Sequence, residues 1–85
     1  MTPHTLIIID VASTARGDQA WRAALGATLT GGAVHVVVTP PALQFCHSAL
    51  AQRARHTLEA FGHHCEAAPL DEALRRLRQH VEVWR

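Results

Sequence analysis

The two cysteines are the side chains of this 85-residue chain with the most distinctive chemistry. Cys46 is followed directly by His47, and Cys65 follows a pair of histidines. A cysteine attacks as the thiolate, which a helix N-terminus or a nearby imidazolium favours by lowering the thiol pKa. Two cysteines make no disulfide framework, and burial as a small apolar side chain is the commoner role of a free cysteine. Both roles stay open for each thiol.

The rank of the two thiols depends on where the second predicted helix begins. If Ser48 is its N-cap, Cys46 lies just before the helix N-terminus and beside His47, and we expect a lowered thiol pKa. If the helix begins at Pro41 instead, Cys46 lies a turn inside and most of that influence is lost. Cys46 with His47 is therefore the first candidate catalytic pair, and Cys65 is the second candidate.

A weaker candidate site precedes the first predicted helix. Ser13, Thr14, Arg16 and Gly17 form a loop ahead of that helix, where backbone N–H groups can bind an anion. The loop lacks both the glycine-rich phosphate motifs and their lysine. Asp10 ends the first predicted strand, but no second carboxylate ends another strand, so we expect it to cap its loop rather than hold Mg²⁺.

The histidines show no spacing typical of a zinc site. The chain has seven of them, yet His63, His64 and Cys65 are too compact to converge on one ion from a single strand. We therefore predict no native metal site and no cofactor. Any metal binding at His63 and His64 would be adventitious.

Charge and hydropathy exclude several classes of partner. The formal net charge is +1, and the basic cluster Arg75, Arg76 and Arg78 follows Asp71 and Glu72, which indicates a solvated helix face rather than a nucleic-acid surface. No apolar run reaches membrane length, and the N-terminus lacks the basic region of a signal peptide. We expect a cytoplasmic protein that binds neither nucleic acid nor membrane.

Alternating aliphatic and helical patterns must position these side chains. The pattern predicts strands over residues 5–11, 33–39, 63–68 and 81–84, the last at a sheet edge. It predicts a first helix over residues 18–29, capped near Gly17 or Asp18, and a second helix ended by Gly62. A short third helix would be capped by Asp71, with Leu70, Leu74 and Leu77 turned inward.

This order predicts one α/β domain over residues 1–85, a flavodoxin-like βαβαβαβ fold with a four-stranded, mostly parallel sheet. The natural strand order is 2-1-3-4. In that order the first helix alone covers one sheet face, and the second and third helices cover the other. Parallel sheets are normally covered on both faces, and a chain this short buries little surface. We therefore expect a homo-oligomer or a hetero-oligomer with related subunits.

The first forty residues resemble the DsrE/DsrF family and its TusD/TusC/TusB relatives, which are small sulfur-relay proteins. The resemblance consists of an aliphatic strand ending at Asp10, a short loop with Gly17, a helix rich in Ala, Leu and Arg, and a strand that follows Gly32. It implies a persulfide carrier with sulfurtransferase-like activity, or a cysteine-poor partner subunit in a ring of related subunits.

The resemblance also implies a position for the sulfur-carrying residue. In active members a cysteine just beyond the third strand carries the persulfide, whereas residues 67–70 here read Ala-Ala-Pro-Leu. Cys65 lies a few residues earlier, inside the predicted strand. The chain is also shorter than most of the family.

Two other functions remain as alternatives. The chain could be a non-catalytic oligomerisation or interaction domain. It would use the sheet face that only the first helix covers, with contacts through the third or fourth strand and Trp84. It could also bind a small anion or nucleotide through the loop before the first helix.

Overall fold

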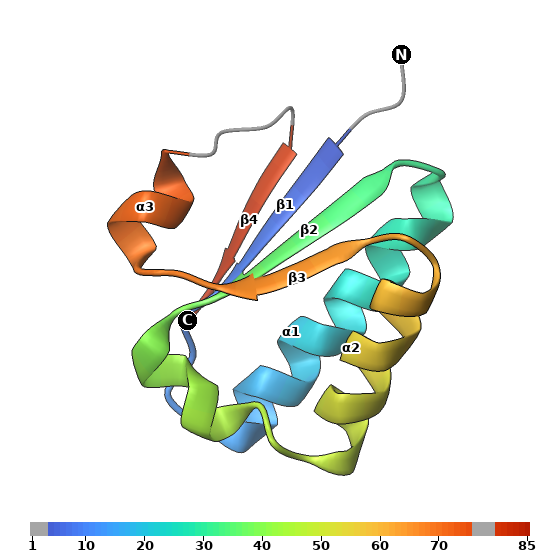
Figure 1. Ribbon diagram of the computed structural model, residues 1–85. Coiled ribbons are helices and arrows are strands. Elements are labelled where there is room, and N and C mark those ends of the chain that lie inside the picture. Colours follow the sequence, from blue (N-terminus) through green and yellow to red (C-terminus); the bar gives the residue numbers. More distant parts are fainter. Residues whose placement is uncertain (1–3, 76–79) are drawn as a thin grey trace.

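The computed structural model describes residues 4–75 and 80–85. Its elements follow the predicted alternation of strands and helices (Figure 1). They are β1 (His4–Ile9), α1 (Thr14–Ala27), the 3₁₀ helix η1 (Thr28–Thr30), β2 (Ala33–Val38), the 3₁₀ helix η2 (Pro40–Phe45), α2 (Ala49–Ala60), β3 (His64–Ala67), α3 (Leu70–Leu74) and β4 (His80–Trp84). None of the helices in these two ranges has the length and apolar character needed to cross a membrane.

The four strands form one parallel sheet in the order β3-β2-β1-β4. The parallel pairing and the edge position of the last strand confirm the prediction, but the predicted flavodoxin-like order 2-1-3-4 is wrong. The physical reason lies in the polarity of the strands. Val36 and Val37 of β2 are both fully buried, which requires an interior strand. The polar β3, with exposed His64, is better placed at the edge.

The strand order also changes which face each helix covers. Because β1, β2 and β3 follow one another in one direction across the sheet, right-handed crossovers place α1 and α2 on the same face (Figure 1). The chain then returns past β1 to reach β4, so α3 lies on the opposite face. The prediction that the first helix covers one face alone is therefore wrong. The sparsely covered face is the one that carries α3.

Each face has its own apolar cluster. On the two-helix face, Trp21 of α1 and Leu58 of α2 pack with small alanines against β1, β2 and β3. On the α3 face the cluster is smaller, and its buried members are Leu6, Ile8, Val37, Ala68 and Ala73. Residues 6–9 of β1 are fully buried because each face of the strand contacts one of the two clusters.

The helix ends differ from the prediction in two places. The N-cap of α1 is Ser13, whose Oγ accepts a hydrogen bond from the Arg16 N–H at 3.2 Å, so the helix begins before Gly17 and Asp18. The helix α3 begins after Pro69 and has no side-chain cap, so Asp71 lies in its first turn instead. Gly62, with φ of 86°, follows α2 as predicted.

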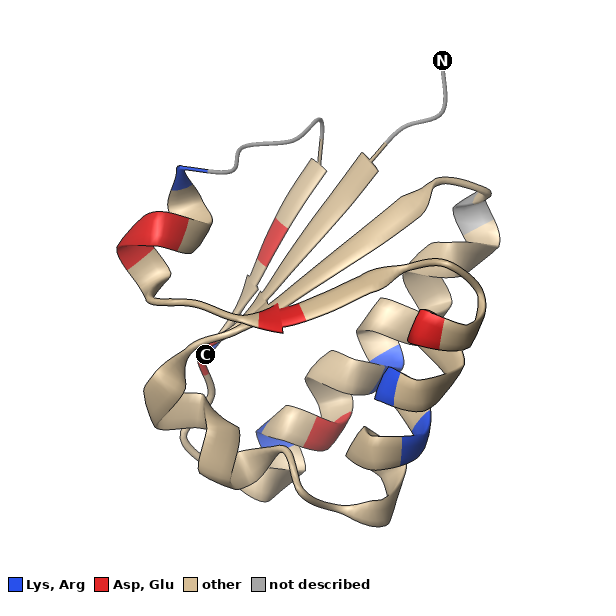
Figure 2. Ribbon diagram, in the orientation of Figure 1, with Lys and Arg blue, Asp and Glu red and all other residues tan. Residues whose placement is uncertain are grey.

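Charged residues lie mainly on the helices (Figure 2). The strands β1 and β2 contain no Lys, Arg, Asp or Glu. Arg75 is exposed, with Nη2 3.9 Å from Asp71 Oδ2, as a solvated helix face requires. Arg76 and Arg78 of the predicted basic cluster, and Leu77 of the predicted third helix, lie outside the described residues.

Candidate functional site

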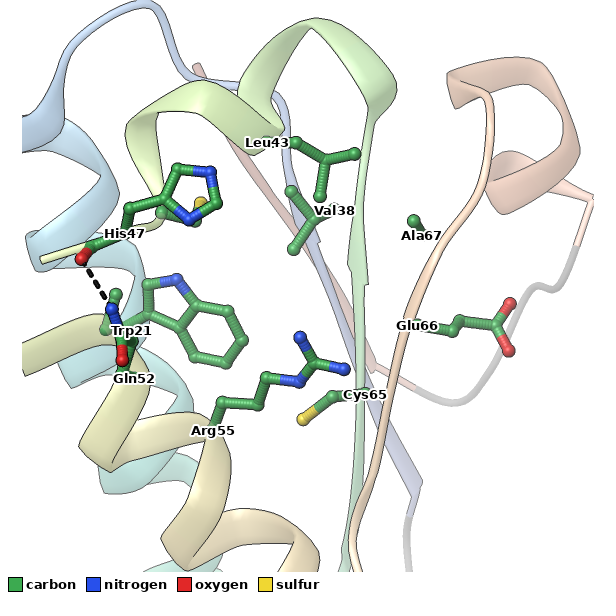
Figure 3. Close-up of a pocket in the computed structure, with 11 residues that line it drawn as sticks. Trp21, Val38, Leu43, His47, Gln52, Arg55, Cys65, Glu66 and Ala67 are labelled. Atoms are coloured by element: carbon green, nitrogen blue, oxygen red, sulfur yellow. Dashed lines mark hydrogen bonds between the residues drawn. The ribbon is translucent and has the colours of Figure 1, made fainter.

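Both cysteines line one pocket of about 330 Å³. It lies between α2 and the carboxyl ends of β2 and β3, where ligand sites of parallel α/β sheets are usually found (Figure 3). Its lining residues come from α1, the ends of the two strands, the segment before α2 and the first turns of α2. They are Trp21, Val38, Leu43, Cys46, His47, Ala51, Gln52, Arg55, Cys65, Glu66 and Ala67. The Glu66 side chain points away from the pocket (Figure 3).

Cys46 is half-buried at the end of η2, just before the N-terminus of α2. Ser48 is the N-cap of that helix, and its Oγ accepts a hydrogen bond from the Ala51 N–H at 3.0 Å. The structure thus selects the first of the two predicted helix starts. The Cys46 thiol donates to the Ala42 carbonyl oxygen at 3.4 Å.

The pKa of the Cys46 thiol is raised, not lowered as expected from its place before the helix. Burial is the largest cause, and the Asp18 carboxylate adds to it. The Trp21 indole N–H acts in the opposite direction by favouring the thiolate. Asp18 is held near this site because its Oδ1 accepts a hydrogen bond from Ser48 Oγ at 2.6 Å. The charge of Asp18 therefore counteracts the benefit of the helix N-terminus.

Trp21 brings a buried hydrogen-bond donor to the pocket. The residue is only 2% exposed, and its Nε1 makes no hydrogen bond within the described residues. Buried indole N–H groups usually find a partner. The acceptor that this donor favours is a negatively charged sulfur on Cys46, whose thiol pKa it lowers.

Cys65 faces the same pocket from β3 and is 8% exposed. Its thiol pKa is raised to about 11, first by burial and then by the Glu59 carboxylate, while Arg55 lowers it. The Arg55 side chain extends from α2 toward Cys65 (Figure 3). Its Nε is also 3.3 Å from Glu59 Oε1. Cys65 is therefore a protonated thiol at neutral pH.

His47 is exposed and lines the pocket. Its carbonyl oxygen accepts a hydrogen bond from Gln52 Nε2 at 2.8 Å (Figure 3), which ties the loop to the first turn of α2. Its role as a catalytic partner of Cys46 stays a prediction.

The predicted anion loop has structural contacts of its own. The Arg16 side chain donates from Nε to the Arg85 carbonyl oxygen at 3.0 Å and from Nη1 to Gln19 Oε1 at 2.7 Å. Its guanidinium carbon also lies 4.9 Å from the centre of the Trp84 ring. Gly17 is buried against η2. Anion binding by Ser13, Thr14, Arg16 and Gly17 stays a prediction, and these contacts do not require it.

Asp10 joins the ends of β1 and β2 instead of standing alone. Its Oδ1 accepts a hydrogen bond from Thr39 Oγ1 at 2.6 Å, and its Oδ2 is 3.8 Å from Arg85 Nε. Both contacts hold the loop after β1, as expected of a capping carboxylate.

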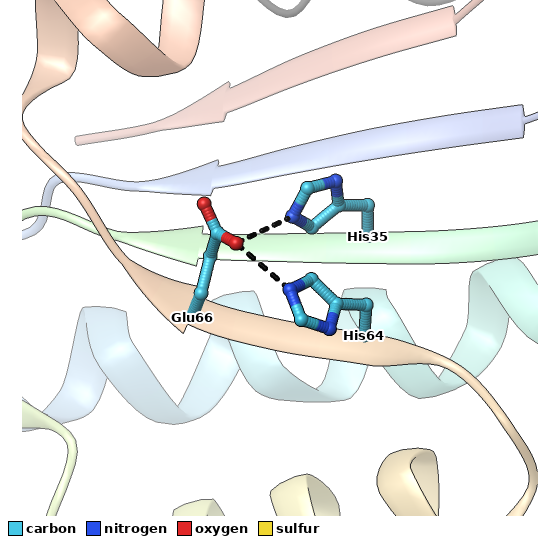
Figure 4. A group of neighbouring side chains, drawn as sticks. All are labelled: His35, His64 and Glu66. Carbon is cyan, nitrogen blue, oxygen red and sulfur yellow. Dashed lines mark hydrogen bonds and ion pairs between the residues drawn. The ribbon is translucent and has the colours of Figure 1, made fainter.

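A second cluster lies on the opposite face of the sheet. His35 of β2 faces His64 of β3, and Glu66 follows His64 on the same face (Figure 4). Strand periodicity alone puts His64 and Glu66 on one face of β3. It could not add His35, because the predicted order put β1 between β2 and β3. The signal available was a histidine in an otherwise aliphatic strand.

Comparisons with protein-family models, curated proteins and solved structures find no match to this chain. Its function is therefore argued from its own side chains.

Proposed function

We propose that this chain is a DsrE-like sulfur carrier that holds a persulfide on Cys46. The observation that carries the proposal is the convergence of both thiols on one pocket, together with the unpartnered indole N–H of Trp21. The buried indole N–H could donate a hydrogen bond to a persulfide anion. Arg55, which is paired with Glu59, also lines the pocket and lowers the pKa of Cys65.

The transfer step requires the Cys46 thiolate. It attacks the terminal sulfur of a persulfide on a donor thiol, and a new S–S bond forms as the donor S–S bond breaks. The donor leaves as a thiolate, so sulfur moves without net oxidation. Because burial raises the pKa of Cys46, loading is slow at neutral pH and accelerates as the pH rises.

Cys46 is the better carrier of the two thiols. A pKa of about 11 for Cys65 leaves roughly one thiolate in ten thousand at pH 7. Cys46 is also less buried than Cys65. In this proposal Cys65 lines the pocket but does not carry the sulfur.

The test is persulfide loading of the native chain, located by peptide mass spectrometry. After incubation with glutathione persulfide, we expect one added sulfur atom on Cys46. C65S should still load and C46S should not. Absence of added sulfur on either cysteine, at pH 7 and at pH 9, would refute the carrier function.

A second function, an interaction domain, is favoured by the sparsely covered face. Leu74 of α3 is 42% exposed and Val83 of β4 is 44% exposed. Val83 pairs in register with Ile8, whose side chain belongs to the α3-face cluster. We propose that this face contacts a second copy or a related subunit. Light scattering at high protein concentration tests it, and a monomer there would refute self-association.

A further inference from the structure

We propose that His35, His64 and Glu66 form a binding site for a divalent transition-metal ion on the α3 face of the sheet. The parallel register of β2 and β3 places His35 directly opposite His64. Glu66 lies two residues further along β3 and therefore points to the same side. One potential ligand atom from each residue lies within 4.8 Å of the other two (Figure 4).

The distances suit one ion between the three side chains. Glu66 Oε2 is 2.8 Å from His64 Nε2 and 3.6 Å from His35 Nε2. In a tetrahedral zinc site with metal–ligand bonds of about 2.0–2.1 Å, neighbouring ligand atoms are about 3.3 Å apart. The two observed distances lie on either side of that value. The third separation, between the ligand nitrogens of His35 and His64, is at most 4.8 Å, and rotation of the two rings about their side-chain bonds would bring it toward the same value.

The ligand types favour a particular class of metal. Two imidazoles with one carboxylate suit Zn²⁺, Co²⁺, Ni²⁺ or Cu²⁺, whereas Ca²⁺ and Mg²⁺ prefer oxygen ligands alone. The two imidazole rings stand edge to face, with centroids 4.8 Å apart and planes at 64°. Neither ring therefore stacks flat on the other.

Exposure leaves one side of the site open. The side chains of His35 and Glu66 are 18% and 26% exposed, whereas that of His64 is 65% exposed. Three protein ligands on one side leave a fourth position for water. Two adjacent strands hold the ligands, and side chains on such elements are positioned more firmly than those on loops.

Other histidines have different partners. His63, next in the chain to His64, accepts a hydrogen bond at Nδ1 from the Val34 N–H at 3.0 Å. His80 and Glu82 repeat the spacing of His64 and Glu66 in β4, with Nε2 and Oε2 3.3 Å apart. His80 pairs in register with Thr5 rather than with a second histidine. His80 and Glu82 therefore offer two ligands but no third, and a substitution of His80 is the matched control for a substitution of His64.

The site is independent of the proposed sulfur carrier, because the thiol pocket lies on the other face of the sheet. The experiment is titration calorimetry with Zn²⁺ on the full chain carrying C46S and C65S, so that neither thiol contributes. We expect one Zn²⁺ per chain. Removing a residue that only hydrogen-bonds to a metal ligand typically weakens metal binding 10–100-fold. H64A and E66Q each remove a direct ligand, so each should weaken Zn²⁺ binding by more than that.

H80A should leave the affinity unchanged. Circular dichroism of H64A and E66Q checks that both variants are folded. We expect this for H64A because His64 is exposed, and for E66Q because glutamine matches glutamate in size. A wild-type affinity in H64A, or an equal loss in H80A, would overturn the proposal. So would several weak Zn²⁺ ions per chain in place of one.

Discussion

Gly17 is the point where α1 comes closest to the segment that carries Cys46. A Cβ atom at this position would lie 2.5 Å from the Phe45 carbonyl oxygen and 3.6 Å from Val11 Cγ2. The first contact is far inside van der Waals distance. Because the obstructing atom belongs to the backbone, no rotation of a side chain relieves it. Gly17→Ala must therefore push α1 and η2 apart.

Two opposing contributions set the size of the effect. Alanine is favoured over glycine within a helix by about 0.5–1 kcal/mol. An extra methyl group forced into a packed interior costs about 1–3 kcal/mol. We expect Gly17→Ala to lower the free energy of unfolding by about 1–2 kcal/mol, and the melting temperature by about 4–8 °C for each kcal/mol.

Gly26 of the same helix provides the matched control. It is exposed, and a Cβ atom there meets nothing within 4 Å. Gly26→Ala should therefore stabilise the protein by about 0.5–1 kcal/mol. Urea unfolding followed by tryptophan fluorescence measures both variants, since Trp21 is buried in the core. The two identical substitutions should change stability in opposite directions.

The displacement should also reach the thiol pocket. Phe45 precedes Cys46, so we expect movement of its carbonyl group to loosen the packing around the Cys46 sulfur. Alkylation of Cys46 in the native state should be faster in Gly17→Ala than in Gly26→Ala. Equal stabilisation by the two substitutions would refute the reasoning, because the close approach of α1 to η2 would then be absent from the folded protein.

Three further predictions concern caps and titration. Ser48→Ala removes the acceptor of the Ala51 N–H and the donor to Asp18. It should lower the free energy of unfolding in urea by about 1–2 kcal/mol, and Ser48→Thr should recover most of that loss. Thr39→Val removes the buried hydroxyl that donates to Asp10 and should cost about 1–3 kcal/mol in thermal unfolding, whereas Thr39→Ser should cost less. An unchanged stability in Ser48→Ala or Thr39→Val would contradict these assignments. Burial raises the pKa of the Cys65 thiol from its ordinary 9.0 to about 11, so the folded state holds this proton more tightly than the unfolded state. The contribution of this thiol to the free energy of unfolding is therefore fully present below pH 9 and is lost between pH 9 and pH 11. Cys65→Ala should flatten that decline, and an equally steep decline in the variant would argue against it.

Local sequence determined most of the secondary structure. The aliphatic runs in β1 and β2 and the alternation in β4 predict strands, because side-chain burial follows the period of the backbone. Gly62 and the alternative N-cap Ser48 marked the ends of α2 because each has the backbone or side-chain property that a helix end needs. The start of α1 was missed because Ser13, Gly17 and Asp18 are all plausible caps.

Strand order could not be deduced from periodicity alone. Every βαβαβαβ chain can be arranged in several sheets, and the choice depends on which strands must be buried on both faces. The aliphatic β2 and the polar β3 contained that information. It becomes useful only when the polarity of all four strands is compared to decide which are interior and which lie at an edge. The half-covered face was expected on the wrong side of the sheet for this reason.

The sequence by itself determined that this chain is an α/β domain with two thiols and a His–Glu pair on one strand. Only the tertiary structure decided what these groups meet. It brought Cys46 and Cys65 to one pocket beside the Trp21 indole, and it raised the pKa of both thiols through burial. It also placed His35 opposite His64, because β2 and β3 are neighbours. Contacts between residues distant in the chain depend on strand order and on burial, and both are properties of the whole folded chain.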